Sequence, residues 1–421
     1  MQPTGKIAPQ PWMTAPETRA VMAALTARGA DVRFVGGCVR DAVLKRPVKD
    51  VDIATPDPPA TVTALLEAAG IKVIPTGIAH GTVTAMIGAA KFEITTLRLD
   101  LATDGRHAKV AFTDNWIADA ARRDFTFNAL SCTSAGDIYD PFDGLADLGD
   151  GVVRFVGIPR ERIEEDYLRL LRFFRMYATY GRPPPDAEAL AACRQLAPGI
   201  ARLSGERVRD EMFRILLAPN AADTAVLMHD THVLEHVVPP PTDIGRLRMM
   251  TWLDSTALKL ASVSPDALRR LAALLRTDAN GAAVLAERLR LSRREAARLA
   301  ALAAPAFELT PEAGTTALHR AVYHCGNETA RDWVLLAWAG ELAVAPRKGG
   351  GRNAAWAALL ETAAGWPAPI FPLKGADAAA LGVTPGPRLG ELLKAVEAWW
   401  EAGDFTADRK ACLARLRDLA G

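Results

Sequence analysis

Two aspartates separated by one residue, Asp50 and Asp52, stand in the segment KDVDIAT. Side chains at positions i and i+2 of a β-strand point to the same face, so both carboxylates could bind the same hard divalent cations, which prefer oxygen ligands. Such cations can lower the pKa of an attacking hydroxyl and stabilise a leaving pyrophosphate. The spacing therefore predicts metal-assisted phosphoryl transfer, with Asp50 and Asp52 as the catalytic metal ligands.

A glycine pair before these aspartates could bind the phosphates. Gly36 and Gly37 follow an apolar run and predict a turn with bare backbone N–H groups, followed by a helix over residues 39–45. Helix N-termini favour anions, and Arg40 can donate two hydrogen bonds to one phosphate. The alternative is a tight strand-to-helix turn, with the two aspartates solvated at the end of a strand.

A second motif, ARRDFTFNAL, spans residues 121–130. It places the cation of Arg123 and the acceptor of Asp124 beside an apolar anchor, so the two side chains could hold a phosphate and a ribose hydroxyl together. A salt bridge on a helix surface is the alternative.

A third motif, EEDYLRLLRFFR, spans residues 164–175 and could select a base. If the segment is an α-helix, Asp166, Arg169 and Arg172 share one face. The carboxylate of Asp166 only accepts hydrogen bonds and the guanidinium of Arg169 only donates them. Cytosine and adenine present an amino donor beside a ring-nitrogen acceptor, and uracil and guanine present the reverse. The pair would therefore bind C and A and leave unpaired groups against U and G, unless these arginines are simply solvated or ion-paired.

Four segments in this order resemble the motifs of one family. VGGCVRDAVLKRPVKDVDIAT, ARRDFTFNAL, YDPFDGLADL and EEDYLRLLRFFR are similar to those of the class II tRNA nucleotidyltransferases and bacterial poly(A) polymerases, within the DNA polymerase β superfamily. The resemblance implies template-independent addition or repair of the 3′-terminal CCA of tRNA from CTP and ATP, with Mg²⁺ as the cofactor and a two-metal mechanism.

The resemblance also implies roles for single residues. Arg123 and Asp124 would contact the sugar of the incoming nucleotide, and Asp166 and Arg169 would select its base. Arg172 and Arg175 would lie near the phosphates or the base.

Two further segments favour the CCA-adding branch of this family. Residues 97–112 are polar with little periodicity and look like the mobile loop used in switching from C to A, and residues 75–88 are similar to that branch. A poly(A) polymerase of the same family and a catalytically inactive RNA-binding relative are the alternatives.

The distribution of patterns along the chain predicts an α+β protein. Short β-type runs crowd the first third, among them residues 72–74 and 82–87, and a helix is expected from Pro59 to Ala69. From about Glu161 onward amphipathic helical patterns prevail. We expect a nucleotidyltransferase head with a mixed β-sheet and flanking helices, followed by an all-helical neck, body and tail. The expected bounds are 1–150 for the head, 151–220 for the neck, 221–365 for the body and 366–421 for an RNA-contacting tail.

The composition limits the possible partners. A net charge of only +1, from 50 basic and 49 acidic residues, means that an RNA partner needs a local basic surface. Five cysteines without CxxC spacing argue against a disulfide framework or a zinc site. The N-terminal residues lack an apolar signal segment, and no run of 18 apolar residues occurs, so we expect a cytoplasmic protein with no membrane partner and no obligatory protein partner.

Three weaker features remain open. Glu93 is a candidate third metal carboxylate or a strand residue paired with Arg98. The His229-Asp230 dipeptide, with His232 and His236 nearby, is similar to that of HD-type metal phosphohydrolases, although a body helix ending at prolines explains it more simply. Two segments could contact RNA, a basic stripe formed by Arg207, Arg209 and Arg214, and a Gly-Pro turn within residues 381–400.

Overall fold

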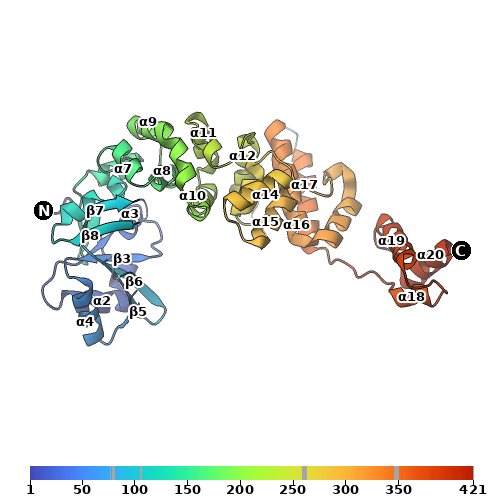
Figure 1. The fold of residues 1–421 in the computed structure, drawn as a ribbon, viewed down its shortest axis with the longest axis horizontal. Coiled ribbons are helices and arrows are strands. Elements are labelled where there is room, and N and C mark those ends of the chain that lie inside the picture. The colour runs from blue at the N-terminus through green and yellow to red at the C-terminus, as the bar shows by residue number, and fades with distance from the viewer. Residues whose placement is uncertain (76, 78–80, 105–106, 258–262, 346–349, 421) are drawn as a thin grey trace. The chain divides into compact units, whose positions relative to one another are not determined.

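The first third of the chain forms a mixed β-sheet (Figure 1). The computed structural model describes residues 1–75, 77, 81–104, 107–257, 263–345 and 350–420. Eight strands pair in the order β1-β10-β9-β2-β3-β6-β5-β4. They are β1 (Gly5–Lys6), β2 (Arg33–Val35), β3 (Val51–Thr55), β4 (Lys72–Ile74), β5 (Thr82–Ile87), β6 (Ala90–Thr96), β9 (Ser131–Cys132) and β10 (Asp137–Tyr139).

One pair of neighbouring strands is parallel and decides how the site is built. β3 and β6 run side by side in the same direction, with Asp52 opposite Glu93, while the other pairings are antiparallel. The sheet is thus mixed, as predicted.

The sheet core is apolar. Phe34, Ile53 and Ile94 on the central strands are buried and pack in one cluster with Leu25 of α2 (Pro16–Thr26) and Leu66 of α4 (Pro59–Ala68). Burial of such side chains stabilises each by about 1.5–3 kcal/mol, which fixes the strands that carry the polar site residues.

Two paired strands lie within residues 97–112, the segment that resembles a mobile loop, and their register shifts between Asp100 and Ala102. β7 (Arg98–Asp104) and β8 (His107–Phe112) pair antiparallel from Arg98 opposite Phe112 to Asp104 opposite His107, which satisfies their backbone groups mutually. Within the segments that pointed to the CCA-adding branch, residues 76, 78–80, 105 and 106 lie outside the described residues.

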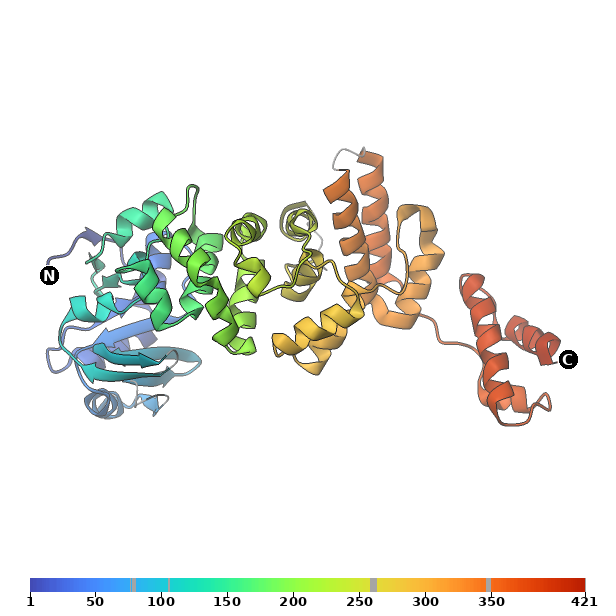
Figure 2. The same ribbon diagram turned by 45° about the horizontal axis from the view of Figure 1, so that its top comes forward.

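After the sheet the described elements are helical (Figure 2). The helices and short 3-10 turns of the first 220 residues, besides α2 and α4, are α1 (Pro11–Thr14), α3 (Gly37–Val43), α5 (Trp116–Ala121), η2 (Thr126–Asn128), α6 (Gly144–Asp150), α7 (Pro159–Glu165), α8 (Leu168–Tyr180), α9 (Ala187–Leu196), η3 (Ala197–Arg202) and α10 (Gly205–Leu217).

The remaining helices begin at Ala221, and most of them belong to a second compact unit. They are α11 (Ala221–Asp230), η4 (Leu234–His236), α12 (Ile244–Trp252), the π-turn η5 (Leu253–Ala257), α13 (Ala267–Leu274), α14 (Ala279–Arg288), α15 (Arg293–Ala303), η6 (Pro311–Ala313), α16 (Gly314–Val344), α17 (Gly350–Gly365), α18 (Gly375–Ala379), α19 (Pro387–Ala402) and α20 (Arg409–Ala420).

Contacts divide the chain into two units. The first comprises Met1–Asn220 with Val226–Val237, and the second comprises Ala221–Ala225 with Val238–Gly421. The predicted α+β class, with a sheet head followed by helices, is confirmed. In the described part of the chain, none of the helices has both the length and the apolar character that crossing a membrane requires.

Candidate active site

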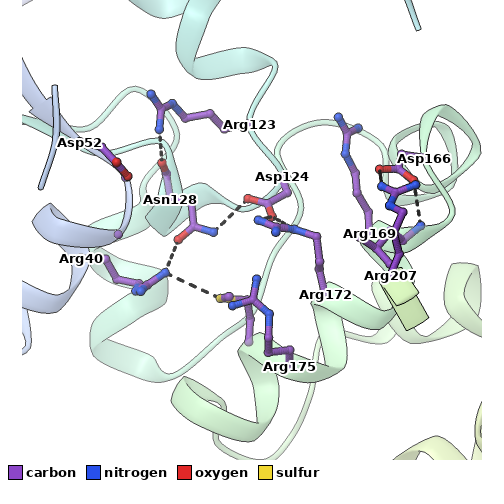
Figure 3. Close-up of a pocket in the computed structure, with 14 residues that line it drawn as sticks. Arg40, Asp52, Arg123, Asp124, Asn128, Asp166, Arg169, Arg172, Arg175 and Arg207 are labelled. Carbon is purple, nitrogen blue, oxygen red and sulfur yellow. Dashed lines mark hydrogen bonds and ion pairs between the residues drawn. The ribbon is translucent and has the colours of Figure 1, made fainter. Parts of the chain in front are cut away.

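A pocket of about 500 Å³ in the first unit contains almost every predicted site residue (Figure 3). It is lined by Gly36, Gly37, Arg40, Asp52, Arg123, Asp124, Asn128, Asp166, Leu168, Arg169, Arg172, Arg175, Met176 and Arg207. Asp50 lines a neighbouring cavity, which Asp52 also lines.

The charge of this pocket differs from that of the whole chain. Six arginines line it, Arg40, Arg123, Arg169, Arg172, Arg175 and Arg207, against three aspartates, Asp52, Asp124 and Asp166. The nearly neutral chain therefore concentrates positive charge at one cavity, which suits a polyanionic ligand.

The glycine turn between β2 and α3 needs its glycine for two reasons. Gly36 has φ +72°, which side chains rarely adopt, and a Cβ there would lie 3.0 Å from Nη1 of Arg123. The prediction of bare N–H groups was wrong for Gly36, because its N–H donates to the Leu130 carbonyl at 3.1 Å. Helix α3 begins at Gly37 and ends at Val43, two residues earlier at each end than predicted.

Arg40 is part of the pocket wall. It is 9% exposed, donates from Nε and Nη2 to the two carboxylate oxygens of Asp41 at 3.0 Å each, and donates from Nη1 to Oδ1 of Asn128 at 2.7 Å. Its guanidinium also lies 4.3 Å from the ring centroid of Tyr180. A phosphate bound by Arg40 would share it with these protein partners.

Asn128 connects the two sides of the pocket and was not singled out from the sequence. Its amide accepts from Arg40 and donates from Nδ2 to Oδ1 of Asp124 at 2.9 Å. Its backbone carbonyl accepts from Nη1 of Arg123 at 3.3 Å. It lies four residues after Asp124 in the second motif, and that position was the only signal the sequence offered.

The Asp124 carboxylate is held ionised by its neighbours. Nε of Arg172 donates to Oδ2 at 2.7 Å, while Oδ1 accepts from Asn128 and from the backbone of Phe125. Burial alone raises the pKa of Asp124, but the charge of Arg172 and these hydrogen bonds outweigh it, so the pKa lies below its ordinary value. Asp124 therefore presents an acceptor at neutral pH.

Asp166 is not on a helix, and the shared helical face predicted for Asp166, Arg169 and Arg172 was wrong in that respect. Asp166 has an extended backbone between α7 and α8, and its Oδ1 accepts the Leu168 N–H at 3.1 Å. The side chain thus accepts from the first residue of α8 while standing just before the N-cap Tyr167, and aspartate favours such local hydrogen bonds over a position inside a helix.

The two predicted base-selecting side chains each have a protein partner (Figure 3). Oδ2 of Asp166 accepts from Nη2 of Arg207 on α10 at 2.6 Å. Arg169 donates to the Glu165 carboxylate and, at 3.0 Å, to the Arg162 carbonyl. These partners fix both side chains at the pocket. Arg207, which the sequence placed in a stripe for RNA, lines the same pocket.

Helix α10 supplies a second partner, which was not predicted from the sequence. Glu211, four residues after Arg207 and 3% exposed, accepts from Nε of Arg175 at 2.6 Å. The i, i+4 spacing of Arg207 and Glu211 places both on one helix face. That spacing was a usable signal, although only the packing of α10 on α8 shows what the face meets.

The surroundings of Asp52 shift its pKa in the opposite direction to that of Asp124. Burial, the charge of Glu93 and that of Asp50 raise its pKa above the ordinary value, and Arg123 opposes them. Asp52 and Glu93 face each other on parallel strands, and Glu93 accepts from Lys91 at 2.6 Å. Asp50, which directly precedes β3, is exposed. Carboxylates that repel one another in this way gain from a bound cation.

The donor atoms of Asp50, Asp52 and Glu93 suit a magnesium ion. The donors are all carboxylate oxygens, yet no three His, Cys, Asp or Glu side chains gather at metal-binding distance within the described ranges. Mg²⁺ commonly takes one or two protein carboxylates and completes its shell with water and substrate phosphates. Asp50 and Asp52 would suffice as its protein ligands.

The His229-Asp230 dipeptide does not line the pocket described above. Both side chains are 66% exposed at the end of α11, and they contact each other at 3.4 Å.

Comparisons with known proteins show which families this chain resembles. The family described as "Poly A polymerase head domain" matches residues 32–154, and "Probable RNA and SrmB- binding site of polymerase A" matches residues 185–243. The mitochondrial CCA tRNA nucleotidyltransferase 1 of Danio rerio is 34% identical over 394 residues, 92% of this chain and 87% of that protein. The mouse (Mus musculus) protein of the same name is 31% identical over 396 residues, 92% and 86% of the two chains.

A solved structure is similar over nearly the whole chain. The CCA-adding enzyme of Bacillus stearothermophilus in complex with CTP has a TM-score of 0.75 and 26% sequence identity, covering 97% of this chain and 98% of that one. The resemblance carried by the four sequence motifs is thereby confirmed, and this chain belongs to the family of class II CCA-adding tRNA nucleotidyltransferases and poly(A) polymerases.

Proposed function

We propose that this protein adds or repairs the 3′-terminal CCA of tRNA, using CTP and ATP and no nucleic-acid template. The observation that carries the proposal is a single basic pocket in which Asp52 lies at one edge and the fixed pair Asp166 and Arg169 at another. The similar Bacillus stearothermophilus structure contains CTP, and the similar animal proteins are named for CCA addition.

The reaction is an in-line displacement at the α-phosphorus. The 3′-oxygen of the RNA gives up its proton to solvent and bonds to the α-phosphorus, while the bond from that phosphorus to the oxygen bridging to the β-phosphate breaks. Pyrophosphate leaves with the bonding electron pair. The reaction needs no covalent intermediate with the protein, so its catalysts are positioning and charge.

The arginines of the pocket bind the triphosphate in this proposal. Arg123, Arg172 and Arg175 are half-buried, and their protein partners Asp119, Asp124 and Glu211 hold the guanidinium groups in place. Asp124, ionised at neutral pH, accepts a hydrogen bond from the ribose. Gly36 and Gly37 leave room for the phosphates beside Arg40.

Asp166 and Arg169 select the base. Their acceptor and donor complement the amino group and ring nitrogen shared by cytosine and adenine. Uracil or guanine would set donor against donor and acceptor against acceptor, which costs about 1–3 kcal/mol for each buried group left unpaired.

Mg²⁺ is the proposed cofactor, with Asp50 and Asp52 as its protein ligands and two ions as the expected number. When bound, it would supply positive charge that stabilises the negative charge on the attacking and leaving oxygens. The carboxylate of Glu93, beside Asp52 on the neighbouring strand, raises the pKa of Asp52 and adds negative charge at this edge of the pocket.

The four-part division of the chain completes the proposal. Residues 1–150 catalyse, 151–220 carry the base-selecting segment, 221–365 form the body and 366–421 contact tRNA. We place the protein in the cytoplasm. Fractionation of cells expressing the tagged chain tests this, because recovery in a membrane or organelle fraction contradicts it.

Addition to a defined acceptor tests the function. Purified protein is incubated with Mg²⁺, a tRNA that ends before CCA, and each nucleoside triphosphate alone or in combination, and the products are sized and sequenced. We expect two C residues with CTP and completion to CCA once ATP is added. Long A tracts on unrelated RNA would instead indicate the poly(A) polymerase, and no addition of any nucleotide would indicate the inactive RNA-binding relative.

A further inference from the structure

The side chain of Asn128 lies in the wall of the nucleotide pocket, the cavity of about 500 Å³ described above. Asn128 ends the 3-10 turn η2, is 8% exposed, and donates its N–H to the Phe125 carbonyl at 2.9 Å. Phe125 and Phe127 of the same segment are at most 1% exposed and stack with ring centroids 5.9 Å apart. Close packing of these rings fixes the backbone of the turn, so the Asn128 amide keeps one position.

Only a side chain with both a donor and an acceptor suits the two neighbours of this amide. Oδ1 of Asn128 accepts from Nη1 of Arg40 at 2.7 Å, and Nδ2 donates to Oδ1 of Asp124 at 2.9 Å (Figure 3). A guanidinium only donates and an ionised carboxylate only accepts, so the two partners decide which way round the amide lies. An aspartate of the same shape would set a second acceptor against Asp124.

The Asp124 carboxylate is held from two directions. Asn128 of the turn η2 donates to Oδ1, and Nε of Arg172 on α8 donates to Oδ2 at 2.7 Å. The Asn128 amide therefore opposes the attraction of Arg172 and keeps the carboxylate between η2 and α8. A buried polar group whose hydrogen bonds are satisfied in this way has a fixed orientation.

The charges around Asn128 leave no place for a second carboxylate. The arginines that line this part of the pocket already form ion pairs, which are Arg40 with Asp41, Arg123 with Asp119, Arg172 with Asp124 and Glu211, and Arg175 with Glu211. A carboxylate at position 128 would compete for these paired cations at the 2.9 Å that separates the amide nitrogen from Asp124. Two carboxylates so close together share a proton instead of both ionising.

We propose that Asn128 is a positioning residue that holds the Asp124 carboxylate toward the ribose of the incoming nucleotide. The amide acts through Asp124, which accepts the hydrogen bond from the sugar. The inference rests on the proposed function and adds to it the residue that keeps the sugar contact in place. It also explains why an amide, and not a carboxylate, lies between Arg40 and Asp124.

Equilibrium binding of CTP with Mg²⁺ and without RNA tests this role. For Asn128→Ala we expect the Kd for CTP to rise about tenfold at every pH, because Asp124 is ionised throughout but no longer held by the amide. For Asn128→Asp we expect a Kd within about threefold of the wild type at about pH 5, where the two carboxylates share a proton, and at least about tenfold higher at about pH 8, where both ionise. Each Kd is divided by that of the wild type at the same pH, so the titration of CTP itself cancels.

A nucleotide without ribose hydroxyls shows whether the effect passes through the sugar. 2′,3′-Dideoxy-CTP offers Asp124 no hydroxyl, so Asn128→Ala should bind it within about twofold of the wild type while losing about tenfold for CTP. The matched control is Asn115→Asp, which makes the same chemical change at the exposed N-cap of α5, where aspartate caps as well as asparagine. It should leave the Kd values of both nucleotides within about twofold at every pH.

Equal losses for CTP and dideoxy-CTP in Asn128→Ala would overturn the inference, because Asn128 would then act on the pocket as a whole. A ratio of Kd values for Asn128→Asp that stays constant from pH 5 to pH 8 would contradict it as well. Thermal unfolding at each pH verifies folding, and Asn128→Ala decides the matter if Asn128→Asp does not fold. The assay contains no RNA and no transfer step, so its outcome is independent of whether the protein adds CCA.

Discussion

The nucleotide pocket and a charge cluster in the helical body both combine arginines with aspartates, but the two regions have different roles. The body charge cluster consists of Asp254, Asp266, Arg269, Arg270, Arg298 and Asp332. Within it, Nη1 of Arg269 lies 2.9 Å from Oδ1 of Asp332, and Nη2 of Arg270 lies 2.6 Å from Oδ1 of Asp254. The side chains of these two pairs are at most 2% exposed.

Accessibility distinguishes the two regions. The buried pairs of the body link α13 to η5 and α16 and cannot meet a ligand. In the pocket, the side chain of Arg172 is 32% exposed although it pairs with Asp124. An arginine paired on one side and open on the other is oriented for a phosphate or base, whereas a sealed arginine only holds helices together. The following variants separate these two roles.

Asp52→Asn should have the largest effect. We expect nucleotide addition to fall about 10³-fold or more, about 4 kcal/mol in activation free energy, because a ligand for the cation is lost. Thermal stability should not fall. The folded-state pKa of Asp52 is raised, so its protonation favours folding at low pH and this contribution is lost as pH rises through that pKa. At pH 7 a neutral asparagine removes a repulsion.

Single-turnover rates and thermal unfolding of the same Asp52→Asn sample check this prediction. Lys91→Ala, which removes an exposed partner of Glu93, serves as a nearby control and should lower the rate far less. An Asp52→Asn protein as active as the wild type would refute the metal assignment.

Asp332→Ala should lower the stability and leave the activity nearly unchanged, which is the reverse of Asp52→Asn. Removing Asp332 takes a buried acceptor from both Arg269 and Arg298 and leaves Asp254 as the remaining carboxylate beside Arg269. This change costs about 3–5 kcal/mol in the free energy of unfolding. The specific activity of the folded fraction at low temperature should remain near that of the wild type. Denaturant unfolding measures the first quantity and steady-state kinetics the second. Asp230→Ala, at an exposed position, is the control, and equal destabilisation by both would contradict the role of burial.

Gly36→Ala should affect both stability and binding by smaller amounts. A Cβ at φ +72° is strained, and its 3.0 Å approach to Nη1 of Arg123 displaces that arginine, so about 2 kcal/mol of stability and a rise in the KM for CTP are expected. Gly149→Ala is the control, because a Cβ at that position in α6 meets no atom within 4 Å. An unchanged melting temperature in Gly36→Ala would show that the turn can relax.

The pH dependence of stability should distinguish Asp124 from Asp52. The folded pKa of Asp124 is lowered, so its contribution is present above the unfolded pKa of about 3.9 and is lost as pH falls through the folded value. Asp124→Asn should therefore cost about 1.5 kcal/mol at pH 7 and progressively less below about pH 4. Urea unfolding at a series of pH values measures this difference, and a constant difference across the series would contradict it.

Local patterns predicted the strands well. The predicted strands 72–74 and 82–87 coincide with β4 and β5, and the helix predicted from Pro59 to Ala69 ends one residue earlier, at Ala68. In these segments alternation of side chains or a proline at the first helical turn decides the structure, and both are visible in the sequence.

Tertiary contacts explain what the sequence could not supply. The helical period continues through Asp166 and Arg169, yet Asp166 lies before α8, accepts from Leu168 and pairs with Arg207, 41 residues later. The partner of Arg175, Glu211, likewise comes from another helix. Periodicity identifies the face of one helix but not which element packs against it, so the residues that hold the pocket together were the ones missed.

The central claim is that the pocket's own side chains decide which nucleotide is added. It is tested most directly by the kcat/KM values of wild type and Asp166→Ala for CTP, ATP, UTP and GTP, with Asp166→Asn as the variant that keeps the shape. We predict that Asp166→Ala loses about tenfold or more of its preference for CTP and ATP over UTP and GTP, while triphosphate binding weakens less. An equal loss with all four nucleotides would contradict the account.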